Sequence, residues 1–135
     1  MVRTFSFVFL LAACVALEGC GGGGRPEAKK HPVNGEVTLD GKPMADGIVY
    51  FKTVATGAID FADVKDGKFQ GRAEAGQRRV EIFAFREGKP IQMGDQKTGA
   101  TRENYLPAKY NTESTLTENV QQGPSNRFEF KLESK

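Results

Sequence analysis

The stretch 33-VNGEVTLDGKP-43 decides the fold of this chain. Its apolar residues Val33, Val37 and Leu39 alternate with polar ones, which is the two-residue period of a strand with one buried face. The Asp-Gly pair that follows supplies a turn, because glycine adopts a positive φ without steric penalty. The stretch therefore predicts a half-buried strand that ends in a tight turn.

Six more segments toward the C-terminus carry strand patterns, and no helical period of useful length is present. With the first strand, the predicted set is 33–39, 47–52, 59–64, 68–71, 77–85, 116–120 and 128–132. Within 77–85, Phe83 and Phe85 lie on the face opposite to Val80 and Ile82. Seven short strands in roughly 100 residues predict an all-β domain, a seven-stranded antiparallel two-sheet sandwich, because a single sheet would leave its apolar face in water.

The segment 87–115 lacks this alternation and contains Met93, Tyr105 and Tyr110. Structureless loops longer than about 15 residues are uncommon in compact domains and are usually functional or mobile. Two interpretations follow: the segment folds back and caps one open end of the sandwich, or it forms a recognition loop. Capping is the favoured interpretation.

The N-terminus has the pattern of an export signal. Arg3 gives it a positive start, and residues 5–17 form a 13-residue run in which only Ser6 is polar. Such a run suits the apolar region of a signal peptide and is too short to span a bilayer, which takes about 20 residues. Residues 1–19 are therefore predicted to be a signal peptide and the mature chain to be exported.

The tetrapeptide Leu17-Glu18-Gly19-Cys20 resembles the lipobox of bacterial lipoproteins. The resemblance implies transfer of diacylglycerol to the Cys20 thiol, cleavage before Cys20 and further acylation with chains such as palmitate. Glu18 departs from the pattern, which usually has a small or apolar residue there.

A second cysteine competes for the lipid. Residues 11–14, which end in Cys14, fit the four-residue pattern better, but their apolar run is short and Cys20 would remain a free thiol. The glycines at 21–24 supply the flexible tether that a lipid anchor at Cys20 needs. Cys20 is favoured, with Cys14 and an unlipidated peptide cut near Gly19 as alternatives.

Residues 20–32 are predicted to be the lipidated cysteine and a flexible linker, and residues 33–135 the folded domain. The linker contains no apolar residue larger than Ala28. His31, the one histidine of the chain, falls in this linker and is predicted to be solvated.

Several stretches resemble carboxypeptidase regulatory-like domains, which have a transthyretin-like fold. Residues 33–43 look like their opening strand, and 63–69 resemble a hallmark hairpin, with Ala62 in place of the usual threonine. Residues 75–82 resemble the following strand, with Arg78 where an aromatic residue often sits.

The stretch 106–111, with 114–116 after it, looks like short lipoprotein members from planctomycete-type bacteria. The resemblance implies a transthyretin-like or Ig-like sandwich that acts as a scaffold or adhesive module without catalysis. Transthyretin-related hydrolases use histidines and a C-terminal tetrapeptide that this chain lacks, so that activity is not carried over.

No residue pattern predicts catalysis, a cofactor or a metal. Both cysteines lie in the export signal, which leaves no evident nucleophile beside a base. Asp60, Asp63 and Asp66 are a loose candidate set for Ca²⁺, but their spacing is not that of an EF-hand. Asp40, Asp46 and Asp66 fit turns better.

The charged residues do not predict a polyanion partner. The net charge of +2 over 135 residues is too small to indicate binding to nucleic acid or to an acidic membrane surface. Arg72, Arg78 and Arg79 could form a basic patch, but alternating charge on an exposed strand face is the favoured interpretation.

The predicted function is that of a non-enzymatic, membrane-anchored and monomeric lipoprotein on the periplasmic or cell-surface side. It would act as a structural or binding module of the cell envelope, with an envelope protein or a glycan as partner. The alternative is a carbohydrate-binding module that uses exposed aromatic side chains of the segment 87–115. Its candidate ligand contacts are Tyr50, Phe83, Phe85, Tyr105 and Tyr110.

Overall fold

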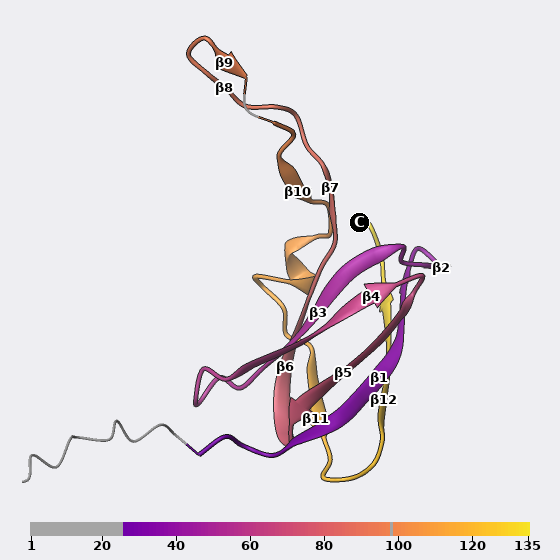
Figure 1. Cartoon of the computed structure of the whole chain (residues 1–135). Coiled ribbons are helices and arrows are strands. Elements are labelled where there is room, and N and C mark those ends of the chain that lie inside the picture. The colour runs from indigo at the N-terminus through magenta and orange to yellow at the C-terminus, as the bar shows by residue number, and fades with distance from the viewer. Residues whose placement is uncertain (1–25, 98) are drawn as a thin grey trace, which may run out of the picture.

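One curled sheet of eight strands forms the body of the molecule (Figure 1). The structure is a computed structural model that describes residues 26–97 and 99–135, so the predicted signal peptide, the lipobox and Cys20 lie outside the described residues. The strands of the sheet are β1 (Lys30–Leu39), β2 (Lys42–Pro43), β3 (Asp46–Lys52), β4 (Ile59–Lys65), β5 (Lys68–Glu74), β6 (Gly76–Phe83), β11 (Thr117–Val120) and β12 (Asn126–Leu132).

The strand order is β11-β6-β3-β4-β5-β1-β12, with β2 paired to β1. All pairs are antiparallel except β1 with β12, which run parallel from Val33↔Asn126 to Leu39↔Leu132. The first and last strands of the domain are therefore neighbours.

The seven predicted segments coincide with strands except at Ala84, which separates β6 from the next strand, and at Leu116, which precedes β11. The two-sheet, seven-strand arrangement is not confirmed. Neighbouring strands are hydrogen-bonded without a break from β11 to β12, so the two halves of one sheet face each other across the core. Strand twist lets a single sheet curl and enclose its apolar face. Hairpins pair β3 with β4 and β4 with β5. The non-consecutive pairs β1–β5 and β3–β6 continue the hydrogen bonding on either side and join into one sheet what the sequence pattern divided into two layers.

The core fills the inside of the curl with aliphatic and phenylalanine side chains. Phe51, Phe69, Phe128 and Phe130 form a ladder with ring centroids 5.8–6.3 Å apart. Gly35 lies against it, and a Cβ there would come 1.9 Å from the carbonyl oxygen of Phe128. Only glycine at this position lets β12 approach β1.

The two predicted Asp-Gly turns are confirmed. Asp40 and Gly41 have φ of 50° and 77°, and Asp66 and Gly67 have 49° and 77°. These are the left-handed conformations that aspartate tolerates and glycine favours in tight hairpins.

The first strand begins earlier than predicted. Lys30, His31 and Pro32 belong to β1 and pair with residues 72–74 of β5, so they are part of the sheet and not of the linker. His31 is 8% exposed, and its Nδ1 accepts a hydrogen bond from the backbone N–H of Gly123 at 3.2 Å. The prediction that His31 is solvated is wrong, because β5 extends far enough to pair with residues that show no apolar alternation.

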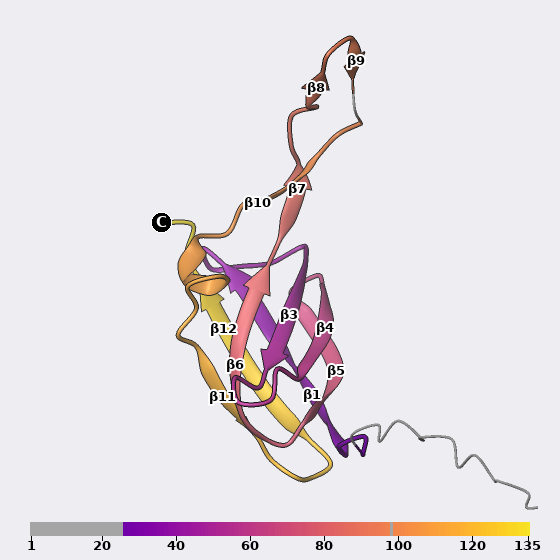
Figure 2. The same ribbon diagram turned by 90° about the vertical axis from the view of Figure 1, so that its left-hand side faces the viewer.

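The segment after β6 divides into an arm and a cap. The arm consists of β7 (Phe85–Glu87), β8 (Gln92–Met93), β9 (Gln96–Lys97) and β10 (Arg102–Asn104), which pair as two short ribbons. It projects from one end of the sheet, here called the arm end; the opposite end, where β1 begins, is called the tether end (Figures 1 and 2).

The cap spans residues 105–115 and contains the 3₁₀ helix η1 (Ala108–Tyr110). Leu106 is buried in the core, Tyr105 and Tyr110 pack against it, and Ser114 Oγ donates to the carbonyl of Val80 at 2.6 Å. The capping interpretation is confirmed for these residues, whereas the arm was not predicted.

Candidate functional site

Four rings form a continuous strip on the outer face of the sheet. This aromatic face consists of Phe61 on β4, Tyr50 on β3, Phe83 on β6 and Phe85 on β7. The ring centroids of successive members are 6.2, 5.6 and 6.2 Å apart. Strand alternation places the rings outside, because neighbours such as Phe51 and Ile82 point into the core.

The aromatic face is open to solvent. Phe61 is 59% exposed, Ile59 beside it is 56% exposed, and the other three rings are half-buried. Phe83 and Phe85 are nearly parallel, with an interplanar angle of 11°, whereas Tyr50 meets Phe83 edge-on at 87°. Contiguous apolar surface of this kind marks interaction sites more often than single exposed residues do.

A charged cluster borders the aromatic face toward the tether end. Glu81 is 5% exposed although it lies on the outer face, because Lys52 and Arg79 cover it. Lys52 Nζ lies 2.5 Å from one Glu81 oxygen, and Arg79 Nη2 lies 3.2 Å from the other. Arg79 also donates to the cap carbonyl of Thr112, and Lys52 lies 5.8 Å from the Tyr50 ring centroid.

A second charged group lies at the arm end of the aromatic face. The Arg102 guanidinium stands 5.1 Å from the centroid of the Phe85 ring. Between them and β4 is a depression of about 320 Å³, whose lining also includes Ile48 and Asp63. Flat rings with polar groups at both ends can hold an amphipathic ligand.

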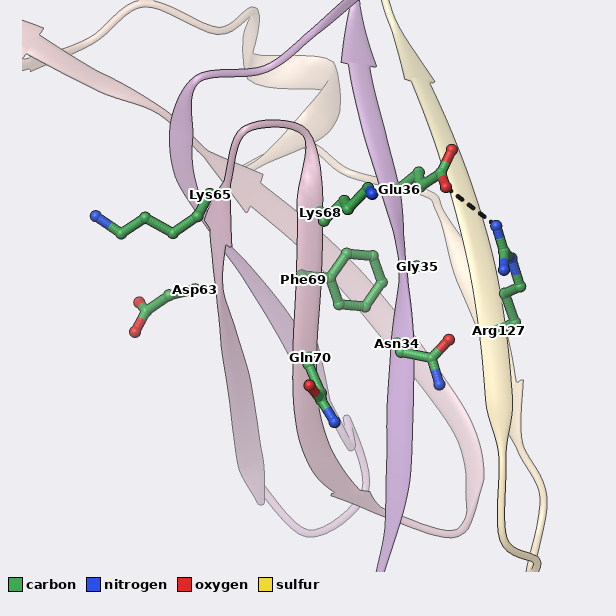
Figure 3. A pocket seen from close by; sticks show the side chains of 9 residues that line it. All are labelled: Asn34, Gly35, Glu36, Asp63, Lys65, Lys68, Phe69, Gln70 and Arg127. Carbon is green, nitrogen blue, oxygen red and sulfur yellow. Dashed lines mark hydrogen bonds and ion pairs between the residues drawn. The ribbon is translucent and has the colours of Figure 1, made fainter.

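A larger depression of about 500 Å³ lies on the other side of β4 (Figure 3). Glu36 and Arg127 form an ion pair of 3.0 Å at one edge of it. Asp63 and Lys65 point the opposite way, so the charged groups do not converge on one point. The depression is a polar surface without a focus for a ligand.

The predicted ligand contacts separate in the structure. Phe83 and Phe85 belong to the aromatic face, as does Tyr50. Tyr105 instead contacts Arg86, which alternates with Phe85 and faces the other way, and Tyr110 accepts a hydrogen bond from the backbone N–H of Glu133. Both of these tyrosines support the cap.

The sequence does not identify Phe61 as a site residue, because both faces of β4 carry apolar residues together with an aspartate. In 59-IDFADV-64, one face carries Ile59 and Phe61 and the other carries Asp60 and Ala62. The structure buries the second set, Asp60 included, because the hairpin register places Val64 opposite the core residue Phe69. The more hydrophobic face is therefore the exposed one.

The buried Asp60 has cationic partners. Lys30 Nζ lies 2.9 Å from its Oδ1, and Arg78 Nη2 lies 3.8 Å from its Oδ2. Arg78 is 1% exposed and also bonds Glu74 at 3.0 Å and the hydroxyl of Thr53. The hydrogen bond and charge of Asp60 raise the pKa of Lys30.

The prediction that Arg78 lies on an exposed strand face is wrong, because its side chain points inward while Arg72 and Arg79 point outward. Asp60 and Asp63 likewise lie on opposite faces of β4. Within residues 26–97 and 99–135, no group of three or more His, Cys, Asp or Glu side chains could hold a metal ion.

No protein-family model, curated protein or solved structure matches the chain. The resemblance to carboxypeptidase regulatory-like domains therefore stays a prediction from sequence. Among the described residues, no helix is long and apolar enough to cross a membrane.

Proposed function

We propose that this chain is an exported, non-enzymatic lipoprotein that is anchored to a membrane through Cys20 and acts as a binding module of the cell envelope. The observation that carries the binding role is the aromatic face, four linked rings that the described residues leave uncovered. We further propose that the two facing halves of the curled sheet correspond to the layers of a carboxypeptidase regulatory-like sandwich.

The anchor rests on the export signal and the lipobox-like residues 17–20. Each buried methylene contributes about 0.8 kcal/mol, so one acyl chain binds marginally and two or three bind stably. Diacylglycerol on Cys20 followed by acylation of its amino group gives the three chains that firm anchoring needs.

Cell fractionation tests the anchor. Cys20→Ser is expected to move the protein from the membrane fraction to the soluble fraction, because it removes the acylated thiol. Cys14→Ser is the matched control and should leave the protein in the membrane fraction. If only the Cys14→Ser variant is released from the membrane fraction, Cys14 carries the lipid and the assignment to Cys20 is wrong.

A glycan is the second candidate for the role of partner. The nearly parallel Phe83 and Phe85 rings present flat apolar surface, and the Lys52–Glu81–Arg79 cluster supplies polar groups beside the strip. Sugars have apolar C–H faces and hydroxyl edges, so rings bordered by charged groups fit them. The platform that we propose therefore lies on β3, β4, β6 and β7, with its four rings outside the segment 87–115.

Binding of the mature Cys20→Ser chain to a glycan panel and to envelope fractions tests the aromatic face. Phe61→Ser is expected to weaken binding about tenfold, as loss of an exposed aromatic anchor does at small interfaces. Val54→Ser is the control, because Val54 is 80% exposed and lies off the aromatic face. Equal binding by both variants would remove the aromatic face as the binding surface.

A further inference from the structure

The tether end of the domain has a cationic surface. A depression of about 370 Å³ is lined there by Lys29, Lys30, His31, Pro32, Arg72, Gln122 and Gly123. The lining contains three cationic side chains and no carboxylate, whereas the depression in Figure 3 mixes cations with Glu36 and Asp63. We call Lys29, Lys30 and Arg72 the basic surface.

The sheet holds the basic surface in place. Arg72 Nη2 donates to the backbone carbonyl of Lys30 at 2.8 Å, which fixes the guanidinium beside the start of β1. Asn126 Nδ2 donates to the carbonyl of Pro32 at 3.0 Å and ties the turn between β11 and β12 to the same strand. These two hydrogen bonds connect β1 to β5 on one side of the depression and to the start of β12 on the other.

Two of the three cations are available to a partner. Lys30 is engaged by Asp60, but Lys29 and Arg72 are exposed and have no carboxylate partner within the described part of the chain. Glu27 is the one exposed carboxylate in residues 26–32. The surface therefore presents an excess of positive charge.

The position of the basic surface relative to Cys20 indicates its partner. Cys20 precedes Lys30 by ten residues, four of them the glycines at 21–24. A chain of ten residues reaches at most about 35 Å when fully extended. The tether end must stay close to the lipid, while the arm end lies on the far side of the sheet (Figures 1 and 2).

We infer that the basic surface docks on the phosphate headgroups of the anionic membrane leaflet in which the lipid anchor sits. The inference rests on the proposed anchor at Cys20. With the tether end on the membrane, the arm points away from the membrane. The aromatic face then lies between the two ends of the domain and is accessible to an envelope partner.

Vesicle co-sedimentation of the unlipidated Cys20→Ser chain tests the docking. The chain should bind vesicles with 30% phosphatidylglycerol better than pure phosphatidylcholine vesicles at low salt, since each cation near an anionic surface contributes about a fivefold change in partitioning. Adding Lys29→Gln and Arg72→Gln should lower the preference for the anionic vesicles about twentyfold. Lys42→Gln with Lys68→Gln removes the same charge at the arm end and should change it less than twofold.

An equal loss in both double variants would mean that net charge alone acts and would overturn the inference. Competition by millimolar inorganic phosphate would also overturn it, because a site for a small anion would then explain the binding. The vesicles test the domain without its lipid. In cells, a Cys20→Ser protein that stays in the membrane fraction after a high-salt wash, which removes electrostatic docking, would disprove the anchor separately.

Discussion

Arg78 is the largest fully buried side chain among the described residues, and its partners explain how the core accommodates an arginine. The side chain points into the tether end of the curl and bonds the carboxylate and carbonyl of Glu74, with Asp60 and Thr53 around it. Burial of a guanidinium has a large desolvation penalty, which only complete pairing offsets. The ion pairs join β4, β5 and β6 where the chain enters the domain.

Arg78→Ala is expected to lower the free energy of unfolding by about 3–5 kcal/mol, because Asp60 would stay buried without this cation nearby. Urea denaturation of the mature Cys20→Ser chain measures the change. Arg127→Ala is the control, since Arg127 is 72% exposed in its pair with Glu36 and should change stability by about 0–1 kcal/mol. Comparable losses would contradict the role of the buried cluster.

Asp40 makes folding stability depend on pH. Its carboxylate accepts a hydrogen bond from the backbone N–H of Ser134 at 3.0 Å, and this bond lowers its pKa from the usual 3.8. The folded state therefore holds the proton less tightly than the unfolded state. The contribution to stability is fully present above about pH 5 and disappears as the pH falls through the lowered pKa.

Asp40→Asn should lower Tm at pH 7 and should lower it progressively less below pH 4. Asparagine tolerates the positive φ of this turn, so the variant removes the charge without straining the backbone. Thermal melts of both proteins between pH 7 and pH 2.5 measure the gap. A gap that stays constant over this range would show that the charge of Asp40 does not matter.

At the scale of elements, the pairing of β1 with β12 depends on one glycine. The Cβ of an alanine at position 35 would lie 1.9 Å from the Phe128 carbonyl oxygen and 2.8 Å from the Phe69 ring. Neither neighbour can withdraw without opening the pair or shifting the phenylalanine ladder. The requirement concerns close approach, because Gly35 has no positive φ.

Gly35→Ala is expected to destabilise the domain by at least about 1–3 kcal/mol through overpacking. Gly99→Ala is the matched control, since a Cβ at Gly99 meets nothing within 4 Å. Chemical denaturation of the two variants compares them. If Gly35→Ala is as stable as Gly99→Ala, β1 and β12 can move apart without a loss of folding free energy, and the requirement for glycine is contradicted.

The features that the sequence predicts well are those that local residue types determine, namely strands with clear alternation and Asp-Gly turns. The Asp40 and Asp66 turns follow from local residue types. Burial of His31 does not, because it depends on β5 and on Gly123. The inward position of Asp60 depends on Arg78, which lies two strands away in the sheet. Local alternation identifies strands, but distant partners determine which face is buried.

At the scale of the whole molecule, the candidate site was predictable only in part. The alternation within 77–85 predicts that Phe83 and Phe85 share one face, and Tyr50 was a candidate on the neighbouring predicted strand 47–52. Phe61 joins them only through the pairing of β3 with β4. The arm was not predictable from sequence. In the part of the chain that the structure describes, its short ribbons do not pack one face against the core, so their residues do not alternate between apolar and polar.

The arm should be the first part of the domain that a protease cuts. No core residue lies between Ala84 and Leu106 among the described residues, so the arm can open without unfolding the sheet. Trypsin is expected to cleave after Lys97 and to leave two fragments that elute together and melt near the Tm of the intact protein. Lys97→Gln should slow this cut, and fragments that separate without denaturant would contradict the independence of the arm.

The pairing of the first described strand with the last also constrains the order in which the sheet forms. The hydrogen bond from Asn126 to Pro32 joins residues 94 positions apart, and Asn126 is the first residue of β12, so the rest of that strand follows it. Such non-local pairing closes late in folding. In the export that we propose, a chain that leaves the channel N-terminus first would hold β1 outside with its β12 edge unpaired until β12 emerges. The proposed signal-peptide processing and acylation at Cys20 would then act on a chain whose sheet is still incomplete.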